Sequence, residues 1–492
     1  MIPIRDTTPD TFAAIRSLLY ERGYTTAGIL ERTDVASLAD ARDRVAGRDQ
    51  PAPADALDIL LRLLLGEHAV PEAAVDAMIG GRTLEPLERV GVLRRTGGDG
   101  GLVEPTVMLY PIEDVYIASD LTRNPADPQA QYALPEDVVY PACTRNTLGF
   151  VASLPRTPCA RFLELCGGTG VAALIAARSA GIAVTADITE RSTRFAAWNA
   201  KLNGLTNVRA VCGDLYVPVA GETFDRIATH PPYMPALEMG YVFRDGGEDG
   251  EQVTRRILEG LADHLAPGGR FHATCFLTSR GEEPIEQRVR GMLGPRHEAF
   301  DVLTVTTALS NVAEYYFRLG LDDDIPLETA ERLATRLAEL GVEAMVLCTL
   351  LVTRPERSGE PVTLRRQRGA RMAPEDLERE LSIARGTEAV PPAEALKPRL
   401  SANARLRVTH VPVNGGWAAE TCVVSVDAPF ARRIEAAADV AAVLDRCDGS
   451  RSVPALFRAL VEERLLPESS TQDEFAATVS QLVRDGILEH AG

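Results

Sequence analysis

The chain has 492 residues, 45% of them hydrophobic and 25% charged, which is typical of a globular protein with about two to four domains. Acidic residues outnumber basic ones by 70 to 52, and this net charge of −18 argues against a nucleic acid partner, although a local basic patch stays open. No apolar run approaches the ~20 residues of a membrane helix, and no signal-peptide core is present, so we expect a cytoplasmic protein without a membrane partner. The eight cysteines form no Cys-x-x-Cys pair, so we expect no metal site.

The N-terminal region shows apolar residues at helical spacing, such as Leu57, Leu61, Leu64 and Leu65. Expected helices cover residues 54–66, 71–78 and 84–92, and a Gly-rich hairpin follows at 92–104. We therefore predict a helical, winged-helix-like domain over residues 1–110. DNA binding is one role for such a domain. The acidic chain instead favours a lid that covers the substrate, or a dimerising element. A homodimer is compatible with the sequence.

A connector over residues 111–159 precedes a region in which strand and helix patterns alternate, residues 160–354. Alternation of this kind predicts an α/β fold with a parallel, Rossmann-like sheet. The last two of seven strands would be an antiparallel addition. The expected strands are residues 162–165, 183–187, 208–212, 224–229, 269–277, 301–307 and 344–352.

Composition changes after Thr353, where residues 355–403 are rich in Pro, Arg and Glu and predict a linker with one helix at 374–383. Residues 404–492 then predict a small α+β domain. Two strands flank the turn Asn414-Gly-Gly, which favours a hairpin. Helices are expected at residues 430–447, 453–463 and 471–485.

The first strand of the α/β region runs into the turn Glu164-Leu-Cys-Gly-Gly-Thr-Gly170 and then into a helix. Small residues allow close approach of a nucleotide-like ligand, and the helix start offers unpaired N–H groups. Asp187 ends the second strand, where a carboxylate can accept from ribose hydroxyls. Asp214 ends the third and is placed for the amine of adenine. The candidate cofactor residues are Glu164, Cys166, Gly167, Gly168, Gly170, Asp187, Asp214 and Leu215.

The fourth strand ends in the loop His230-Pro231-Pro232-Tyr233. Two successive prolines stiffen the loop and provide carbonyl oxygens without neighbouring N–H groups. Rigid carbonyls, a polar side chain and an aromatic ring together suit the orientation of a planar acceptor. These four residues are the candidate catalytic residues.

Residues 160–280 resemble class I methyltransferases that use S-adenosylmethionine (SAM), through the Gly-rich turn, Asp187, Asp214 and the Pro-Pro-Tyr loop. Within that class they look most like the Asn-Pro-Pro-Tyr group, which includes release-factor glutamine N5-methyltransferases. The segment that starts at Phe243 is similar to the Gly-x-Asp-Gly segment of that group. The resemblance implies SAM as the cofactor and an acceptor held at residues 230–233.

The first residue of the loop is His230, whereas the group has Asn. An imidazole with an ordinary pKa near 6.5 could act as a general base or only orient the acceptor. We therefore expect methyl transfer to a small molecule, such as a specialised metabolite or a carrier-borne or peptide-borne intermediate. The alternatives are glutamine N5-methylation of a protein and a SAM-sensing, DNA-binding regulator. Tyr140, Thr144, Tyr315 and Tyr316 are weaker candidates for the site, and packing explains them equally well.

Overall fold

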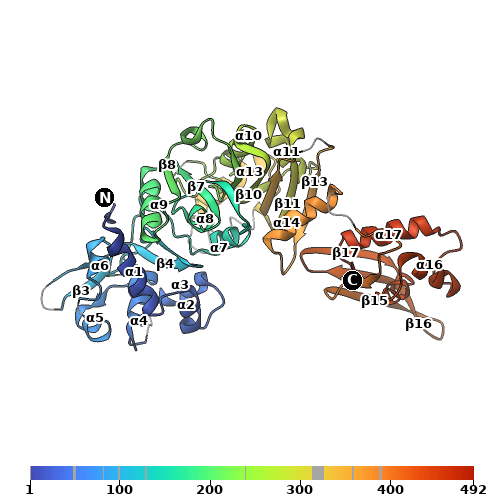
Figure 1. Ribbon diagram of the computed structural model, residues 1–492, viewed down its shortest axis with the longest axis horizontal. Coiled ribbons are helices and arrows are strands. Elements are labelled where there is room, and N and C mark those ends of the chain that lie inside the picture. The colour runs from blue at the N-terminus through green and yellow to red at the C-terminus, as the bar shows by residue number, and fades with distance from the viewer. Residues whose placement is uncertain are drawn as a thin grey trace. The chain divides into compact units, whose positions relative to one another are not determined.

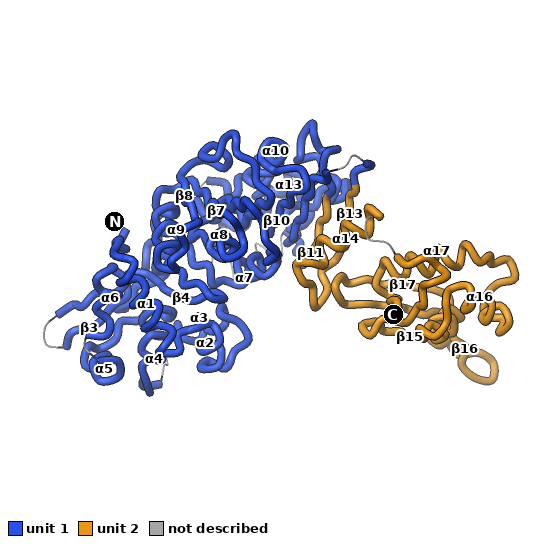
Figure 2. Tube along the Cα trace, in the orientation of Figure 1, with its two compact units in different colours: residues 1–301, 308–361 blue, residues 302–307, 362–492 orange. Residues whose placement is uncertain are grey.

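The structure is a computed structural model, shown in Figure 1. It describes residues 2–47, 51–80, 82–97, 100–127, 130–238, 240–312, 326–356, 359–386 and 390–491. Tyr315 and Tyr316 lie outside these ranges. The chain divides into two compact units (Figure 2): residues 1–301 with 308–361, and residues 302–307 with 362–492.

The first part of unit 1 is helical. Its helices are α1 (Pro9–Glu21), α2 (Thr26–Thr33), α3 (Leu38–Val45), α4 (Ala56–Leu60), continued by a π-helical turn over Leu61–Leu65, α5 (Glu72–Met78) and α6 (Glu85–Arg89). Side chains of Thr8, Thr25, Ser37 and Asp55 cap α1 to α4, each accepting from a backbone amide three residues on. The expected hairpin is present as β2 (Leu93–Arg95) and β3 (Leu102–Pro105), with β1 (Val70–Pro71) on the other side of β3.

This helical part shares a hydrophobic core with the α/β part of unit 1. Trp198 on α9 (Glu190–Leu202) packs edge-on against Phe12 at 5.4 Å between ring centroids, and its indole N–H donates to the carbonyl of Arg5. Asn199 exchanges two hydrogen bonds with the backbone of Ala118 in β5 (Val115–Ser119), which pairs with β4 (Met108–Ile112). The N-terminal helices are thus anchored on α9.

The sheet of unit 1 has the order β12-β10-β9-β6-β7-β8. Its strands are parallel except β12, which runs antiparallel to β10, so the sheet is mixed as expected. The strands are β6 (Cys159–Leu165), β7 (Ala180–Asp187), β8 (Val208–Cys212), β9 (Phe224–Thr229), β10 (Leu265–Ser279) and β12 (Ala344–Thr353). The helices around it include α7 (Arg145–Ala152), α8 (Val171–Ala176), α10 (Gln252–His264), α11 (Ile285–Met292) and α13 (Leu327–Glu339).

The strands of unit 2 that pair side by side follow the order β15-β16-β17-β13-β11. Its strands are β15 (Ala404–Val413), β16 (Gly416–Val426), β17 (Phe430–Ala437), β13 (Thr363–Arg368) and residues 302–307 of β11 (Asp301–Asn311). Its helices are α14 (Pro374–Ala384), α15 (Val440–Asp445), α16 (Val453–Glu462) and α17 (Gln472–Arg484), and β14 (Pro398–Leu400) pairs with β18 (Leu488–His490).

Two features of unit 2 differ from the expectation. The helix expected over residues 430–447 is wrong in its first half, because residues 430–437 form β17 and pair in register with β16. Cross-strand pairing along an existing hairpin outweighs the helix propensity of its alanines. Residues 355–403 contain β13 as well as the expected helix, since β13 is held by pairing with β11 and β17.

Among the described residues, no helix is both long and apolar enough to cross a membrane.

Candidate functional site

The turn after β6 is organised by Glu164. Its carboxylate accepts hydrogen bonds from the amides of Ala172 and Ala173, at 3.0 and 3.1 Å, in the first turn of α8. Glu164 is 2% exposed, and burial raises its pKa to about 7. The side chain therefore fixes the helix start, and the N–H groups that it occupies are not free for a ligand.

The turn itself is tightly shaped. Cys166 has a φ of 54°, a left-handed conformation that favours glycine. A Cβ at Gly167 would lie 2.0 Å from the hydroxyl oxygen of Thr185 on β7, so only glycine fits there. Burial raises the pKa of the Cys166 thiol, which is therefore protonated at neutral pH. The result is a close-packed backbone cradle at the tip of β6.

Asp187 at the tip of β7 connects three segments. One carboxylate oxygen accepts from the amide of Gly168 at 2.9 Å, and the other accepts from the amide and hydroxyl of Thr189. The carbonyl of Asp187 accepts from the amide of Gly213 at 2.9 Å. The structure thus brings together the Gly-rich turn, Asp187 and the end of β8, as the order of the strand tips predicts.

The end of β8 carries Asp214 and Leu215. Leu215 has a φ of 49°, and the carboxylate of Asp214 lies 2.6 Å from the guanidinium of Arg256 on α10. Both partners of this pair are about half exposed. Arg256 has no sequence signal, because its proximity to Asp214 arises only from the packing of α10.

The loop after β9 begins beside the Gly-rich turn, since the Thr229 hydroxyl donates to the carbonyl of Leu165 at 2.9 Å. Among the described residues, the carbonyls of Pro231 and Pro232 accept no hydrogen bond. Tyr233 packs edge-on against Phe276, with 5.3 Å between ring centroids.

Helix α7 contacts this loop through three residues. Asn146 donates to the Tyr233 hydroxyl at 3.1 Å, and the hydroxyl of Thr147 lies 3.4 Å from His230 Nδ1. The ring of Phe150 stacks on the imidazole, with 5.5 Å between centroids. Sequence reasoning missed these residues, because the only signal is the helix start after Thr144, which the sequence places merely near the site.

His230 is neutral in this setting. Its Nε2 is buried and has no hydrogen-bond partner among the described residues, and burial lowers its pKa to about 4. A group with so low a pKa is a weak proton acceptor near pH 7. The environment therefore favours orientation over general-base catalysis.

The segment 244–250 packs against the loop 230–233 and supports it. The amide of Met234 donates to the carbonyl of Arg244 at 2.9 Å, and the amide of Gly246 donates to the carbonyl of Met234 at 2.8 Å. A Cβ at Gly246 would lie 2.8 Å from the carbonyl oxygen of Pro232 and 2.9 Å from Cα of Tyr233. Position 246 thus requires glycine because the two backbones are in contact.

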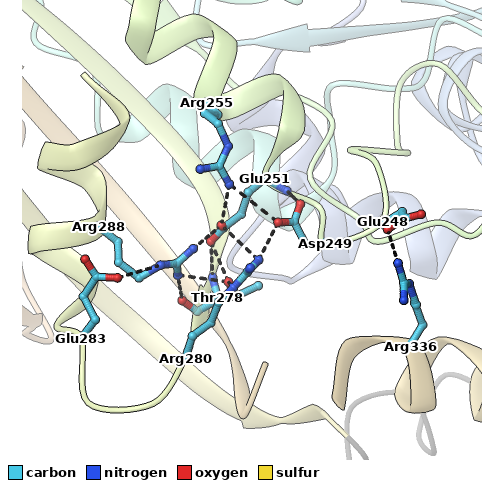
Figure 3. Close-up of polar contacts among 9 residues, drawn as sticks. All are labelled: Glu248, Asp249, Glu251, Arg255, Thr278, Arg280, Glu283, Arg288 and Arg336. Atoms are coloured by element: carbon cyan, nitrogen blue, oxygen red, sulfur yellow. Dashed lines mark hydrogen bonds and ion pairs between the residues drawn. The ribbon is translucent and has the colours of Figure 1, made fainter. Parts of the chain in front are cut away.

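Glu251 holds this segment in place (Figure 3). Its fully buried carboxylate accepts from the amide and hydroxyl of Thr278, at 2.6 and 2.9 Å, and forms an ion pair with Arg288, which is 8% exposed. Arg255 and Arg280 lie 3.6 and 3.5 Å from the same carboxylate. Glu251 therefore ties the start of α10 to the end of β10 and to α11.

Known proteins are similar in sequence to this part of the chain. Residues 146–290 match the methyltransferase small domain family. The chain is 36% identical over 140 residues to the ribosomal protein uL3 glutamine methyltransferase of Bradyrhizobium diazoefficiens, covering 26% of this chain and 43% of that protein. It is 33% identical over 124 residues to the release factor glutamine methyltransferase of Gloeobacter violaceus, covering 22% and 43%. Among solved structures, the tRNA m1G37 methyltransferase of M. jannaschii aligns over 54% of this chain and 63% of its own, with 12% identity and a TM-score of 0.30.

Residues 146–290 are a SAM-dependent methyltransferase domain of class I, and the cofactor is SAM. Within that class the domain lies near the protein glutamine N5-methyltransferases. The chain spans less than half of the length of the first two relatives.

Proposed function

We propose that this protein methylates the side-chain amide nitrogen of glutamine in a protein or peptide. The observation that carries the proposal is the similarity to glutamine methyltransferases, combined with a matched region, 146–290, that contains the Gly-rich turn and the loop 230–233. The relatives favour this acceptor over the small molecule that the altered loop suggests.

The residues at the strand tips fit SAM. A backbone cradle that no Cβ can enter at Gly167 suits close contact with a nucleoside, and the carboxylates of Asp187 and Asp214 suit its hydroxyl and amino groups. SAM supplies an activated methyl group when bound. We propose that Asp187, Gly168 and Asp214 hold it, and that Glu164 and Cys166 act by shaping the turn.

The loop would position the acceptor. The unpaired carbonyls of Pro231 and Pro232 accept the N–H groups of a planar amide, and the ring of Tyr233 packs on its face. His230 is neutral and orients the amide, for which its buried Nε2 provides an unused hydrogen-bonding group. Positioning of this kind accounts for much of the rate of a transfer from an activated donor.

The proposal is tested by measuring which class of molecule receives a labelled methyl group. Full-length protein is incubated with methyl-labelled SAM and lysate of its source cells, which is then separated into protein, nucleic acid and small-molecule fractions. We expect label in the protein fraction, on a glutamine side chain located by tandem mass spectrometry. Label confined to the small-molecule fraction would establish the metabolite acceptor instead, and label confined to nucleic acid would exclude both.

Two variants assign the signal to this site. Asp187→Ala removes the carboxylate that accepts from the amide of Gly168 in the Gly-rich turn and should abolish SAM binding together with transfer. His230→Ala should lower transfer while SAM binding stays within about twofold, because the imidazole lies at the acceptor loop. Equal loss of SAM binding in both variants would contradict the separation into a donor side and an acceptor side.

A further inference from the structure

Unit 2 contains an arginine-lined cleft between β13 and β17. The two strands pair only at Gln367–Ala431 and Arg368–Phe430. A cavity of about 300 Å³ opens beside this short ladder. Its lining residues are Arg365, Arg366, Gln367, Ala431, Arg432, Arg433, Ile434 and Asp485.

A second cavity, of about 380 Å³, shares Arg366 and Asp485 with the first. It adds further cations, Arg385 and Arg484, and the acid Glu380. Positive groups therefore outnumber negative ones around the cleft, in a chain whose formal net charge is −18. A local excess of this sign selects an anionic ligand.

The arginines of the cleft have two different roles. Arg432 forms ion pairs with Glu380, at 2.8 Å, and with Asp485, and Arg366 also pairs with Glu380. These pairs are mostly buried and hold α14 and α17 to the sheet. Arg365 and Arg433 are exposed and form no ion pair among the described residues. Two guanidinium groups are therefore free to receive carboxylates, which they bind in bidentate fashion.

The chemistry of the cleft distinguishes a peptide from a nucleic acid. Asp485 and Glu380 lie among the arginines and would repel a continuous phosphate backbone, whereas spaced carboxylates can avoid them. Among the residues that the structure describes, none that lines the cleft is aromatic and could stack on bases. Beyond Ala431, none of the described residues pairs with the side of β17 that faces β13, so an extended backbone has donors and acceptors to meet there.

We propose that this cleft binds an acidic, extended segment of the protein or peptide acceptor. The proposal rests on the proposed function only in that the acceptor is a polypeptide. Carboxylates of the segment pair with Arg365 and Arg433, and its backbone lies along β17. Unit 2 thus selects substrates through an acidic sequence other than the methylated residue.

The test measures binding without methyl transfer. The probe is a fluorescein-labelled peptide of alternating Glu and Ala, titrated with full-length protein and followed by fluorescence anisotropy. The Arg365→Ala/Arg433→Ala double variant should bind about tenfold more weakly. Arg451→Ala/Arg458→Ala removes the same charge from exposed positions of unit 2 outside the cleft and should bind like the unmodified protein.

Three results would overturn the proposal: no binding of the Glu-Ala peptide, equal weakening in both double variants, or equally tight binding of a Gln-Ala peptide. Tighter binding of labelled oligothymidylate with the same dependence on Arg365 and Arg433 would replace it with a nucleic acid site. Equal thermal midpoints of the variants would show that both are folded. If the peptide binds but no glutamine is methylated, only the proposed function fails.

Discussion

His230 Nδ1 lies 3.4 Å from the hydroxyl oxygen of Thr147, and that hydroxyl accepts a hydrogen bond from Thr144 at 3.1 Å. With Thr144 as the donor in this pair, the Thr147 hydroxyl can donate to Nδ1, and in that arrangement the imidazole proton resides on the buried Nε2. We expect helix α7 to favour this tautomer of His230, the first residue of the loop.

Replacement of Thr147 should reveal this role. Thr147→Val keeps the shape but removes the donor, so both tautomers become populated and the transfer rate should fall about two- to tenfold, with SAM affinity unchanged. Thr147→Ser restores the hydroxyl and should recover the rate. Long-range ¹H–¹⁵N correlation spectra of histidine-labelled protein report the tautomer directly. If the valine variant matched the serine variant in rate and tautomer, the Thr147 hydroxyl would not control the tautomer of His230.

A substitution at Gly246 tests whether its contact with the loop 230–233 positions that loop. In Gly246→Ala the new methyl group would meet the carbonyl of Pro232 at 2.8 Å, so the loop must move. Displacement of the loop's carbonyls should lower kcat by more than about tenfold, because orientation is lost, while SAM binding by calorimetry stays unchanged. Gly291→Ala on α11 is the matched control, since its Cβ would meet nothing within 4 Å. Unchanged kcat in Gly246→Ala would show that the contact does not position the loop.

The placement of the residues proposed to hold the cofactor was predictable from sequence because their order is local. In a parallel sheet each strand tip follows its strand in the chain, so the order of the strands alone assigns the Gly-rich turn, Asp187 and Asp214 to one edge. The strands β6, β7, β8, β9, β10 and β12 of unit 1 were predictable for a related reason, since most are apolar runs bounded by turn residues.

The acceptor side was less predictable because it depends on tertiary contacts. Thr147 and Phe150 reach His230 from a helix that lies far earlier in the chain, and no spacing rule connects them. The pKa of His230 also departs from its ordinary value only through this enclosure. Likewise β17 is a strand because β16 lies beside it, although its alanines and charged residues read as a helix.

Glu251 and Glu248 form a matched pair for stability (Figure 3). Glu251→Gln removes the buried counter-charge of Arg288, whose other acidic partner, Glu283, is exposed and 3.9 Å away, and should lower the free energy of unfolding by about 3–5 kcal/mol. Glu248 pairs with Arg336 at 2.9 Å with both side chains exposed, at 60% and 38%, so Glu248→Gln should cost less than about 1 kcal/mol. Urea unfolding curves give both values. Equal costs would show that burial does not decide the contribution of these ion pairs.

The buried side chain of His272 should make the free energy of unfolding depend on pH. It lies in the middle of β10, is fully buried, and neither ring nitrogen has a hydrogen-bond partner among the described residues. Burial, with smaller contributions from Arg226 and Arg270, lowers its pKa to about 3, whereas the unfolded chain has a histidine pKa of about 6.5. Between these values the unfolded state binds a proton that the folded state does not, so the free energy of unfolding falls as the pH is lowered from about 6.5 to about 3.

The contribution of His272 is isolated by substitution. His272→Leu removes the titrating ring, so the loss of stability between pH 7 and pH 5 should be smaller than in the unmodified protein by about 2 kcal/mol, at about 1.4 kcal/mol per pH unit. Groups common to both proteins, including Glu164, cancel in this difference. His410→Leu, at an exposed position of β15, should change the slope little. Chemical unfolding at both pH values measures the effect, and an unaltered slope in His272→Leu would mean that this histidine is protonated in the folded state.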